Sequence, residues 1–111
     1  MIYIIRDRAT KEQLQEMMEM LETYVKLAVD IDRGILAGGG AMHADCEALL
    51  LEDGSQQEFI WGADWNPESQ EVTFESLINI RPRQNNRSLE LQDPELRTKV
   101  EQVTRKLLGG V

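Results

Sequence analysis

Hydrophobic residues recur at helical spacing in the first third of the chain. Leu14 begins a series with steps of three and four residues that ends near Ala28, and such spacing is typical of one buried helix face. Thr10 and Gln13 precede the series as a capping box, in which each side chain bonds the other residue's backbone N–H. The pattern predicts a short strand over residues 1–5 and then an amphipathic helix of about five turns.

Alternation replaces helical spacing in the middle of the chain. Three runs, at about 44–52, 57–65 and 71–80, alternate in polarity and are separated by turn sequences at 53–56 and 66–69. Because successive side chains of a strand point to opposite faces, these runs predict a three-stranded antiparallel meander. One predicted face collects the apolar residues Ala44, Cys46, Ala48, Leu50, Phe59, Trp61, Ala63, Trp65, Val72, Phe74 and Ile78.

The two turns also set a trial register for the meander. Ala48 then faces Trp61, and Trp61 faces Phe74, so that small residues meet large ones. A slip of two residues would keep every side chain on its face and change only its partner.

A second helix is predicted near the carboxyl end. Asp93 suits the N-cap, Pro94 the first helical position, and Gly109 the end of the helix. Its apolar stripe is Leu96, Val100, Val103 and Leu107. The chain is therefore predicted to form one α+β domain over residues 1–111. In it, an antiparallel sheet with the meander at about 44–80 packs against an N-terminal and a C-terminal helix.

Composition fits this class and limits the setting. The chain has 111 residues, 41% of them hydrophobic, and one cysteine, so no internal disulfide can form and a reducing compartment is favoured. The apolar residues 1–5 are too few for a signal peptide or a membrane span, and Arg6 follows at once. We expect a cytoplasmic protein with no membrane partner.

Charge is unevenly distributed along the chain. The net charge is −8, and residues 34–80 hold nine carboxylates with no lysine or arginine, whereas residues 81–111 hold seven bases and four acids. Nucleic-acid binding needs a basic surface that displaces counterions, so nucleic acid is an unlikely partner class. The basic tail suits contact with the acidic segment, either in the same chain or in a second copy.

The segment around the only histidine carries the candidate chemistry. His43, Asp45 and Glu47 alternate, so in a strand they share one face. The trial register then places Asp45 in one row with Asp64 and Glu71. Neighbouring strands lie about 4.8 Å apart, so three carboxylates there need a cation, a shared proton or water.

This acidic row leaves two interpretations open. Asp45, Asp64, Glu71 and His43 are an acceptable ligand set for a divalent metal, and a metal-activated water there would favour hydrolysis. One histidine is few for zinc, however, and a solvated or arginine-paired acidic face is the commoner arrangement. No cofactor is needed for folding at this length, so none is expected, and a divalent metal is the one that the row would allow.

Arg81, Arg83 and Arg87 form the only basic cluster. Guanidinium groups hold phosphates and carboxylates in paired hydrogen bonds, so the cluster is a candidate contact for an anion or a partner. In the predicted sheet it lies at the opposite end of the third strand from His43. The two groups are therefore not expected to form one site within a single copy.

Several short segments together resemble a small bacterial family that is known only as a domain of unknown function. The segments are Asp32-Arg33-Gly34, Ala37-Gly38-Gly39-Gly40, His43-Ala44-Asp45-Cys46-Glu47, Trp61-Gly62-Ala63-Asp64-Trp65 and Asn79-Ile80-Arg81-Pro82. The resemblance covers nearly the whole chain. It implies a compact cytosolic protein and supplies no activity, cofactor or catalytic residue.

These observations favour a non-enzymatic module that self-associates or binds a protein partner. The chain lacks a complete catalytic set, and four apolar residues on the second sheet face require a cover, which a helix or another subunit would provide. These residues are Leu49, Leu51, Ile60 and Leu77. The alternatives are a metal-dependent hydrolase at the acidic row and an anion-binding module at the arginine cluster.

Overall fold

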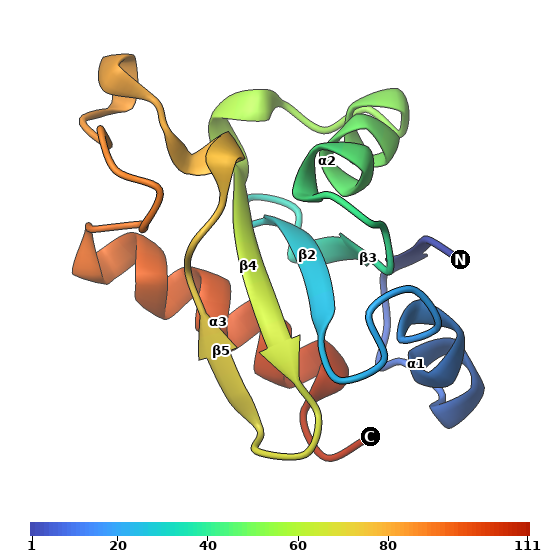
Figure 1. Cartoon of the computed structure of the whole chain (residues 1–111). Helices are drawn as coiled ribbons and strands as arrows, with labels where there is room; N and C mark the ends of the chain where they lie inside the picture. The colour runs from blue at the N-terminus through green and yellow to red at the C-terminus, as the bar shows by residue number, and fades with distance from the viewer.

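A five-stranded antiparallel sheet forms the centre of the molecule. The computed structural model covers residues 1–111, and its strands follow the order β1-β3-β2-β4-β5 (Figure 1). The strands are β1 (Tyr3–Ile5), β2 (Val25–Asp30), β3 (Ile35–Gly38), β4 (Ile60–Asn66) and β5 (Glu71–Thr73).

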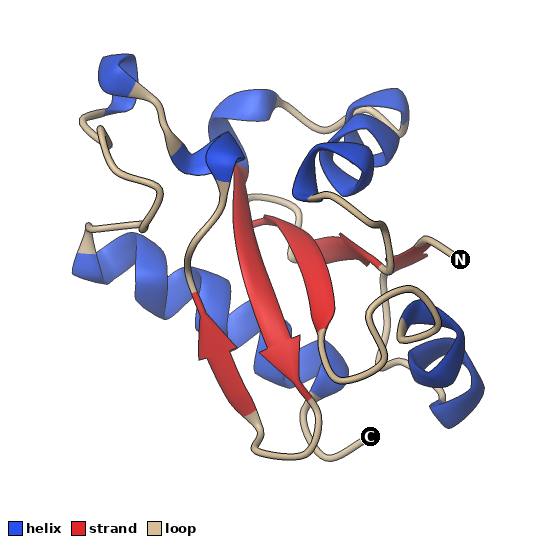
Figure 2. Ribbon diagram, in the orientation of Figure 1, coloured by secondary structure: helices blue, strands red, loops and turns tan.

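Three α-helices pack on the sheet, and they are α1 (Lys11–Met17), α2 (His43–Glu52) and α3 (Pro94–Leu108). Figure 2 shows α2 on one side of the sheet and α3 across the other. Three short 3-10 helices complete the chain, of which η2 (Leu77–Asn79) follows β5 and borders α2. This arrangement confirms the α+β class and the placement of a helix near each end. None of the helices has the length and apolar character that crossing a bilayer requires.

The alternation of β2 explains why both faces of the sheet are covered. Val25, Leu27 and Val29 are fully buried in the core on the α3 side, which also holds both tryptophans. Ala28 belongs to the smaller core beneath α2, together with Cys46. A central strand buried on both faces reads as a nearly continuous apolar run, as this one does.

The first helix is shorter than its pattern predicts. Its capping box is confirmed, because Thr10 and Gln13 exchange the two expected hydrogen bonds. The helix nevertheless ends at Met17, and the chain turns at Glu22, whose φ is +67°. The residues after Tyr24 form strand β2, since Val25, Leu27 and Val29 also fit a period of two and valine favours strands.

The first of the three predicted meander strands is wrong, because residues 43–52 form helix α2. Ala, Leu and Glu dominate this segment, and these residues have high helix propensity. Only Cys46 and Leu50 are buried, four residues apart, which is the spacing of one helix face. Polar and apolar residues alternate in this segment although it is a helix, because the helix is short and only weakly amphipathic.

The other two predicted strands pair as β4 and β5, in a register shifted by two residues. Asp64 faces Thr73 and Trp65 faces Val72, whereas the trial register placed Asp64 opposite Glu71. The faces are confirmed, because Trp61, Trp65 and Phe74 are all buried in the α3-side core. Regular pairing ends at Thr73, and a 3-10 helix stands where the rest of the third run was predicted.

The carboxyl-terminal helix is confirmed in detail. The Asp93 side chain accepts a hydrogen bond from the backbone N–H of Glu95, and Pro94 opens α3. Val100 and Leu107 are buried against the sheet. This helix closes the α3 side and leaves the α2 side as the face that carries the candidate site.

Candidate functional site

His43 and Asp64 form a dyad between α2 and the sheet. His43 is the first residue of α2, and its Nε2 lies 2.8 Å from Asp64 Oδ1 and 3.1 Å from the Ala63 carbonyl oxygen. Both oxygens accept hydrogen bonds, so Nε2 carries the hydrogen. Thr73 donates its hydroxyl to the other Asp64 oxygen at 3.5 Å. Nδ1 is therefore the ring nitrogen without a protein partner.

The predicted acidic row does not form, because its first strand is a helix. Asp45 projects from the first turn of α2 and is exposed, and Glu47 turns toward Arg81. Asp64 and Glu71 do line one pocket of about 200 Å³, together with Thr73 and four other polar or aromatic residues. Nowhere do three histidine, cysteine, aspartate or glutamate side chains come close enough to hold a metal ion.

Arg81 belongs to the architecture of this face rather than to an open basic cluster. It is largely buried and pairs with Glu47 at 3.3 Å. Its guanidinium also donates to the carbonyl oxygens of Ile78, Gln57 and Ile60. Burial raises the pKa of Glu47 against the opposing effect of Arg81, and burial likewise lowers the pKa of Arg81. This pair fastens α2 to the end of β4.

Arg81 pairs with Glu47 of the predicted acidic cluster but forms no bond with His43, so the prediction that the arginines and His43 do not share one site stays a prediction. Glu47 follows His43 by four residues on α2, which places both side chains along one side of the helix. Arg83 and Arg87 are exposed, and neither is in an ion pair. The predicted cluster thus divides into one structural arginine and two at the surface.

An apolar pocket of this face lies beside His43. Seven residues line its volume of about 160 Å³, and we call it the Leu77 pocket: Lys26, Met42, His43, Ala44, Ser76, Leu77 and Ile78. Leu77 is 69% exposed and Met42 53% exposed. Two large apolar side chains therefore stand in water at the edge of one small pocket.

The four apolar residues predicted on this sheet face have different positions. Ile60 is fully buried beneath α2, so a helix does cover part of the face. Leu49 is partly buried on α2. Leu51 and Leu77 remain exposed, and Leu77 borders the pocket.

Lys26 is the member of this pocket that the sequence did not indicate. It lies directly opposite Asp64 in the β2–β4 ladder. Its ammonium has no ion pair and no hydrogen bond to protein, although the residue is partly buried. The prediction of a long first helix placed Lys26 on that helix rather than in strand β2. The Lys26 side chain combines an apolar stem with an ammonium that is free to bond an incoming anion.

Asn79 fixes the segment that carries Leu77. Its buried side chain accepts from the Gly62 N–H at 2.8 Å and donates to the carbonyl oxygens of Gly62 and Phe74. Gly62 is required for this approach, since a Cβ there would lie 2.4 Å from the Ser76 Cβ. Hydrophobic periodicity in a sequence does not reveal hydrogen bonds between a side chain and the backbone.

Cys46 takes no part in the site. It is fully buried under α2, and burial raises the pKa of its thiol to about 11. A thiol that stays protonated at neutral pH is a poor nucleophile. The prediction from its apolar face, a small core residue, is confirmed by the burial.

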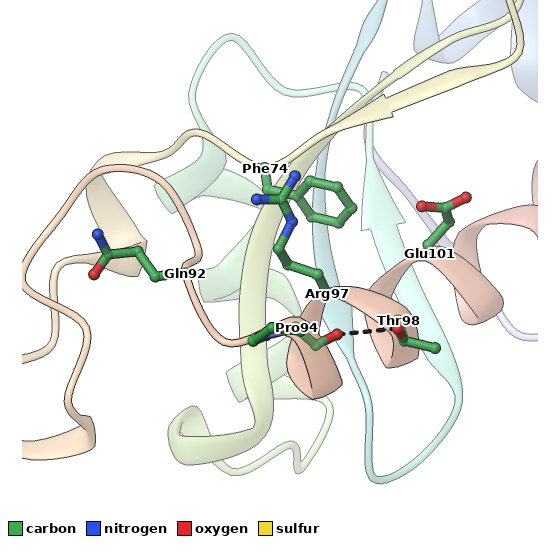
Figure 3. Close-up of a pocket in the computed structure, with 6 residues that line it drawn as sticks. All are labelled: Phe74, Gln92, Pro94, Arg97, Thr98 and Glu101. Atoms are coloured by element: carbon green, nitrogen blue, oxygen red, sulfur yellow. Dashed lines mark hydrogen bonds between the residues drawn. The ribbon is translucent and has the colours of Figure 1, made fainter.

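A larger and more polar pocket lies on the α3 side. Figure 3 shows Arg97 over the ring of Phe74, with its guanidinium carbon 4.5 Å from the ring centroid. Thr98 donates to the Pro94 carbonyl oxygen at 3.0 Å, and Glu101 pairs with Arg105. The volume is about 340 Å³. Because Arg97, Thr98 and Glu101 each already have a bonding partner, this pocket is less suited to a ligand than the Leu77 pocket.

Comparison with known proteins places the chain in a family. The model of a family described as a protein of unknown function (DUF5674) matches residues 3–107. The chain belongs to this family. No curated protein and no solved structure matches it.

Several residues of the segments that resembled a family of unknown function lie on the α2 side of this DUF5674 chain. His43 and Glu47 lie on α2, Asp64 lies on β4, Asn79 is the last residue of η2, and Arg81 follows η2. His43 bonds Asp64, Glu47 bonds Arg81, and Asn79 bonds the backbone of β4. These contacts build the frame of the Leu77 pocket.

Proposed function

We propose that this DUF5674 protein is a self-associating interaction module whose contact surface is the Leu77 pocket. The observation that carries the proposal is Leu77 itself, which is 69% exposed at the edge of the apolar pocket. Isolated exposed leucines are ordinary, whereas an exposed leucine beside an apolar hollow is typical of a contact surface.

A second copy of the chain is the occupant that fits best. In a two-fold dimer the same patch serves both subunits, so Leu77 of each copy can pack against Met42, Ala44 and Ile78 of the other. One surface then supplies both the projecting side chain and the apolar walls that receive it. No feature of a different partner has to be assumed.

Charge complementarity also favours a second copy. The exposed Glu75 carboxylate lies two residues before Leu77, and Lys26 lines the pocket without an ionic partner. A segment that inserts Leu77 brings Glu75 with it toward Lys26 of the other subunit. Such reciprocal charges align an interface even where they add little affinity.

The size of the chain permits a standard interface. Stable complexes bury about 800 Å² on each partner, which is about one eighth of the 6186 Å² surface of this chain. The Leu77 pocket and the exposed residues around it, including Ile80, are the centre of such an area. Central apolar anchors usually dominate binding energy.

Replacing the central side chain tests the proposal. We expect Leu77→Ser to weaken self-association at least about tenfold, because it removes apolar area from both halves of the interface. Light scattering coupled to size-exclusion chromatography over a range of concentrations measures the effect. Met20→Ser is the matched control, since Met20 is 57% exposed and does not line the pocket. Equal behaviour of the two variants contradicts the proposal.

A further inference from the structure

We propose that Lys26 and His43 make the Leu77 pocket a binding site for a small carboxylate that carries a short aliphatic tail. This site uses the same pocket as the proposed interface but rests on other residues. The interface depends on the exposed Leu77, whereas the ligand site depends on two nitrogen groups at the pocket wall.

The first argument is the pairing of charges on this face. Asp64 faces Lys26 across the ladder but accepts its hydrogen bond from His43 Nε2, at 2.8 Å. Lys26 is left with no acceptor although it is partly buried on an apolar pocket. A free ammonium at the wall of an apolar pocket forms a charge-assisted hydrogen bond with an anion, so the pocket is suited to a negatively charged group.

The second argument is the state of the imidazole. Nε2 is occupied by Asp64 and the Ala63 carbonyl oxygen, so Nδ1 is the nitrogen that a ligand can meet. A neutral Nδ1 only accepts hydrogen bonds, whereas a protonated one donates. A ligand carboxylate would therefore bind together with one proton, which places the imidazolium between the ligand and Asp64.

The charges in the occupied pocket balance. Asp64 and the ligand carry two negative charges, and Lys26 and protonated His43 carry two positive charges. The other acidic groups nearby are Asp45, which is exposed on α2, Glu47, which is paired with Arg81, and the exposed Glu71 and Glu75. The Thr73 hydroxyl contacts Asp64 from β5 and adds no charge.

The third argument is the shape and lining of the pocket. A volume of about 160 Å³ is the space of about five water molecules, which limits the ligand to a few heavy atoms. Met42, Ala44, Leu77 and Ile78 provide apolar walls for the tail. Ligand sites of this kind combine apolar walls with a few converging polar groups.

Butyrate is a suitable probe, and the only histidine is a suitable reporter. Side-chain NMR signals of His43 can be assigned without ambiguity because the chain contains one histidine. We expect butyrate to shift these signals in a saturable manner and to raise the midpoint of their pH titration. At pH values above the midpoint of the free protein, the affinity for butyrate should fall about tenfold for each pH unit, since one proton is taken up with each ligand.

Matched probes and a variant complete the test. Butanol and butylammonium have the same tail, and both should bind at least about tenfold more weakly than butyrate. Lys26→Met keeps the aliphatic stem and should weaken butyrate binding by a similar factor. The absence of a saturable shift with butyrate at about 100 mM, where a millimolar site is filled, would overturn the proposal, as would an equal response to butanol.

The two proposals use the same pocket, so the butyrate titration is made at protein concentrations at which the chain is monomeric. Butyrate binding by a protein that stays monomeric at every concentration would support the ligand site and refute the self-association. Self-association at higher concentration, with no response of the monomer to butyrate, would do the reverse.

Discussion

Arg81 has the most demanding environment of any single residue on the α2 side. Its guanidinium satisfies three backbone carbonyl groups and the Glu47 carboxylate, and it stacks 4.4 Å from the centroid of the Trp61 ring. Removing one partner of a buried ion pair costs more than the pair contributes, because the other charge stays buried.

We therefore expect Arg81→Ala to lower the free energy of unfolding by about 3 kcal/mol. Urea unfolding followed by tryptophan fluorescence measures the change. The neighbouring Arg83 is exposed and has no ion pair, so Arg83→Ala should stay within about 0.5 kcal/mol of the parent protein. Similar losses in the two variants would contradict the structural role of Arg81.

Cys46 provides a second test at the scale of one residue. Its burial and its thiol pKa of about 11 predict that a thiol reagent at pH 8 reacts with the folded protein far more slowly than with the urea-unfolded protein. Absorbance of the released chromophore follows the reaction. Rapid stoichiometric labelling of the folded protein would show that α2 does not cover the thiol.

At the scale of elements, Asn79 holds η2 against β4. Asn79→Ala leaves the Gly62 N–H without its side-chain acceptor and removes one donor each from the carbonyl oxygens of Gly62 and Phe74, of which the second keeps its bond from the Leu91 N–H. We therefore expect a loss of about 3 kcal/mol. Chemical unfolding measures this loss. The exposed Gln102 on α3 is the control, and Gln102→Ala should change stability little. If both variants unfold alike, the Asn79 contacts do not anchor η2.

Asp53 links the end of α2 to the sheet, through Arg6 beyond β1 and Arg33 in the β2–β3 turn. Hydrogen bonds from Arg6 and then Arg33 lower the pKa of Asp53 from 3.8 to about 2. A carboxyl group whose pKa is lowered by folding stabilises the folded protein at pH values above its pKa in the unfolded state. This contribution is lost as the pH falls through its pKa in the folded state.

Asp53→Asn should therefore lose less stability than the parent protein between pH 4 and pH 2, the window set by the two values of 3.8 and about 2. Thermal melting at a series of pH values measures the difference. Parallel pH dependence in both proteins would mean that the two arginines do not favour the Asp53 carboxylate.

The elements also explain where prediction from sequence succeeded. Thr10 and Asp93 were found because a cap is local chemistry that neighbouring residues specify. Residues 25–29 and 43–52 were assigned wrongly because short apolar series fit both a period of two and a period near 3.6. The turn at Glu22 contains no glycine, proline or asparagine, so the sequence did not indicate a turn there.

The candidate site was predictable only in part for the same reason. His43 and Asp64 were both identified as chemistry-bearing residues, and the structure brings them together from a helix and a strand. The predicted row failed at Asp45 because its segment is a helix, and at Glu71 because β5 is shifted by two residues from the trial register. Lys26 and Asn79 were missed because their roles depend on tertiary contacts rather than on local patterns.

At the scale of the whole molecule, the account depends on whether the face beside α2 is a contact surface. Two cores and three helices leave Leu77 exposed on that face. Each copy carries a net charge of −8, so salt screens the repulsion between copies while the apolar contact persists. Self-association should accordingly be maintained or strengthened as salt is raised.

Sedimentation equilibrium of the unmodified protein tests this claim most directly. Over a range of protein concentrations, at low and at high salt, we predict an average mass that rises from 12.7 kDa toward twice that value. The transition should occur at lower protein concentration in high salt. A mass of one chain at every concentration and at both salt levels would contradict the account.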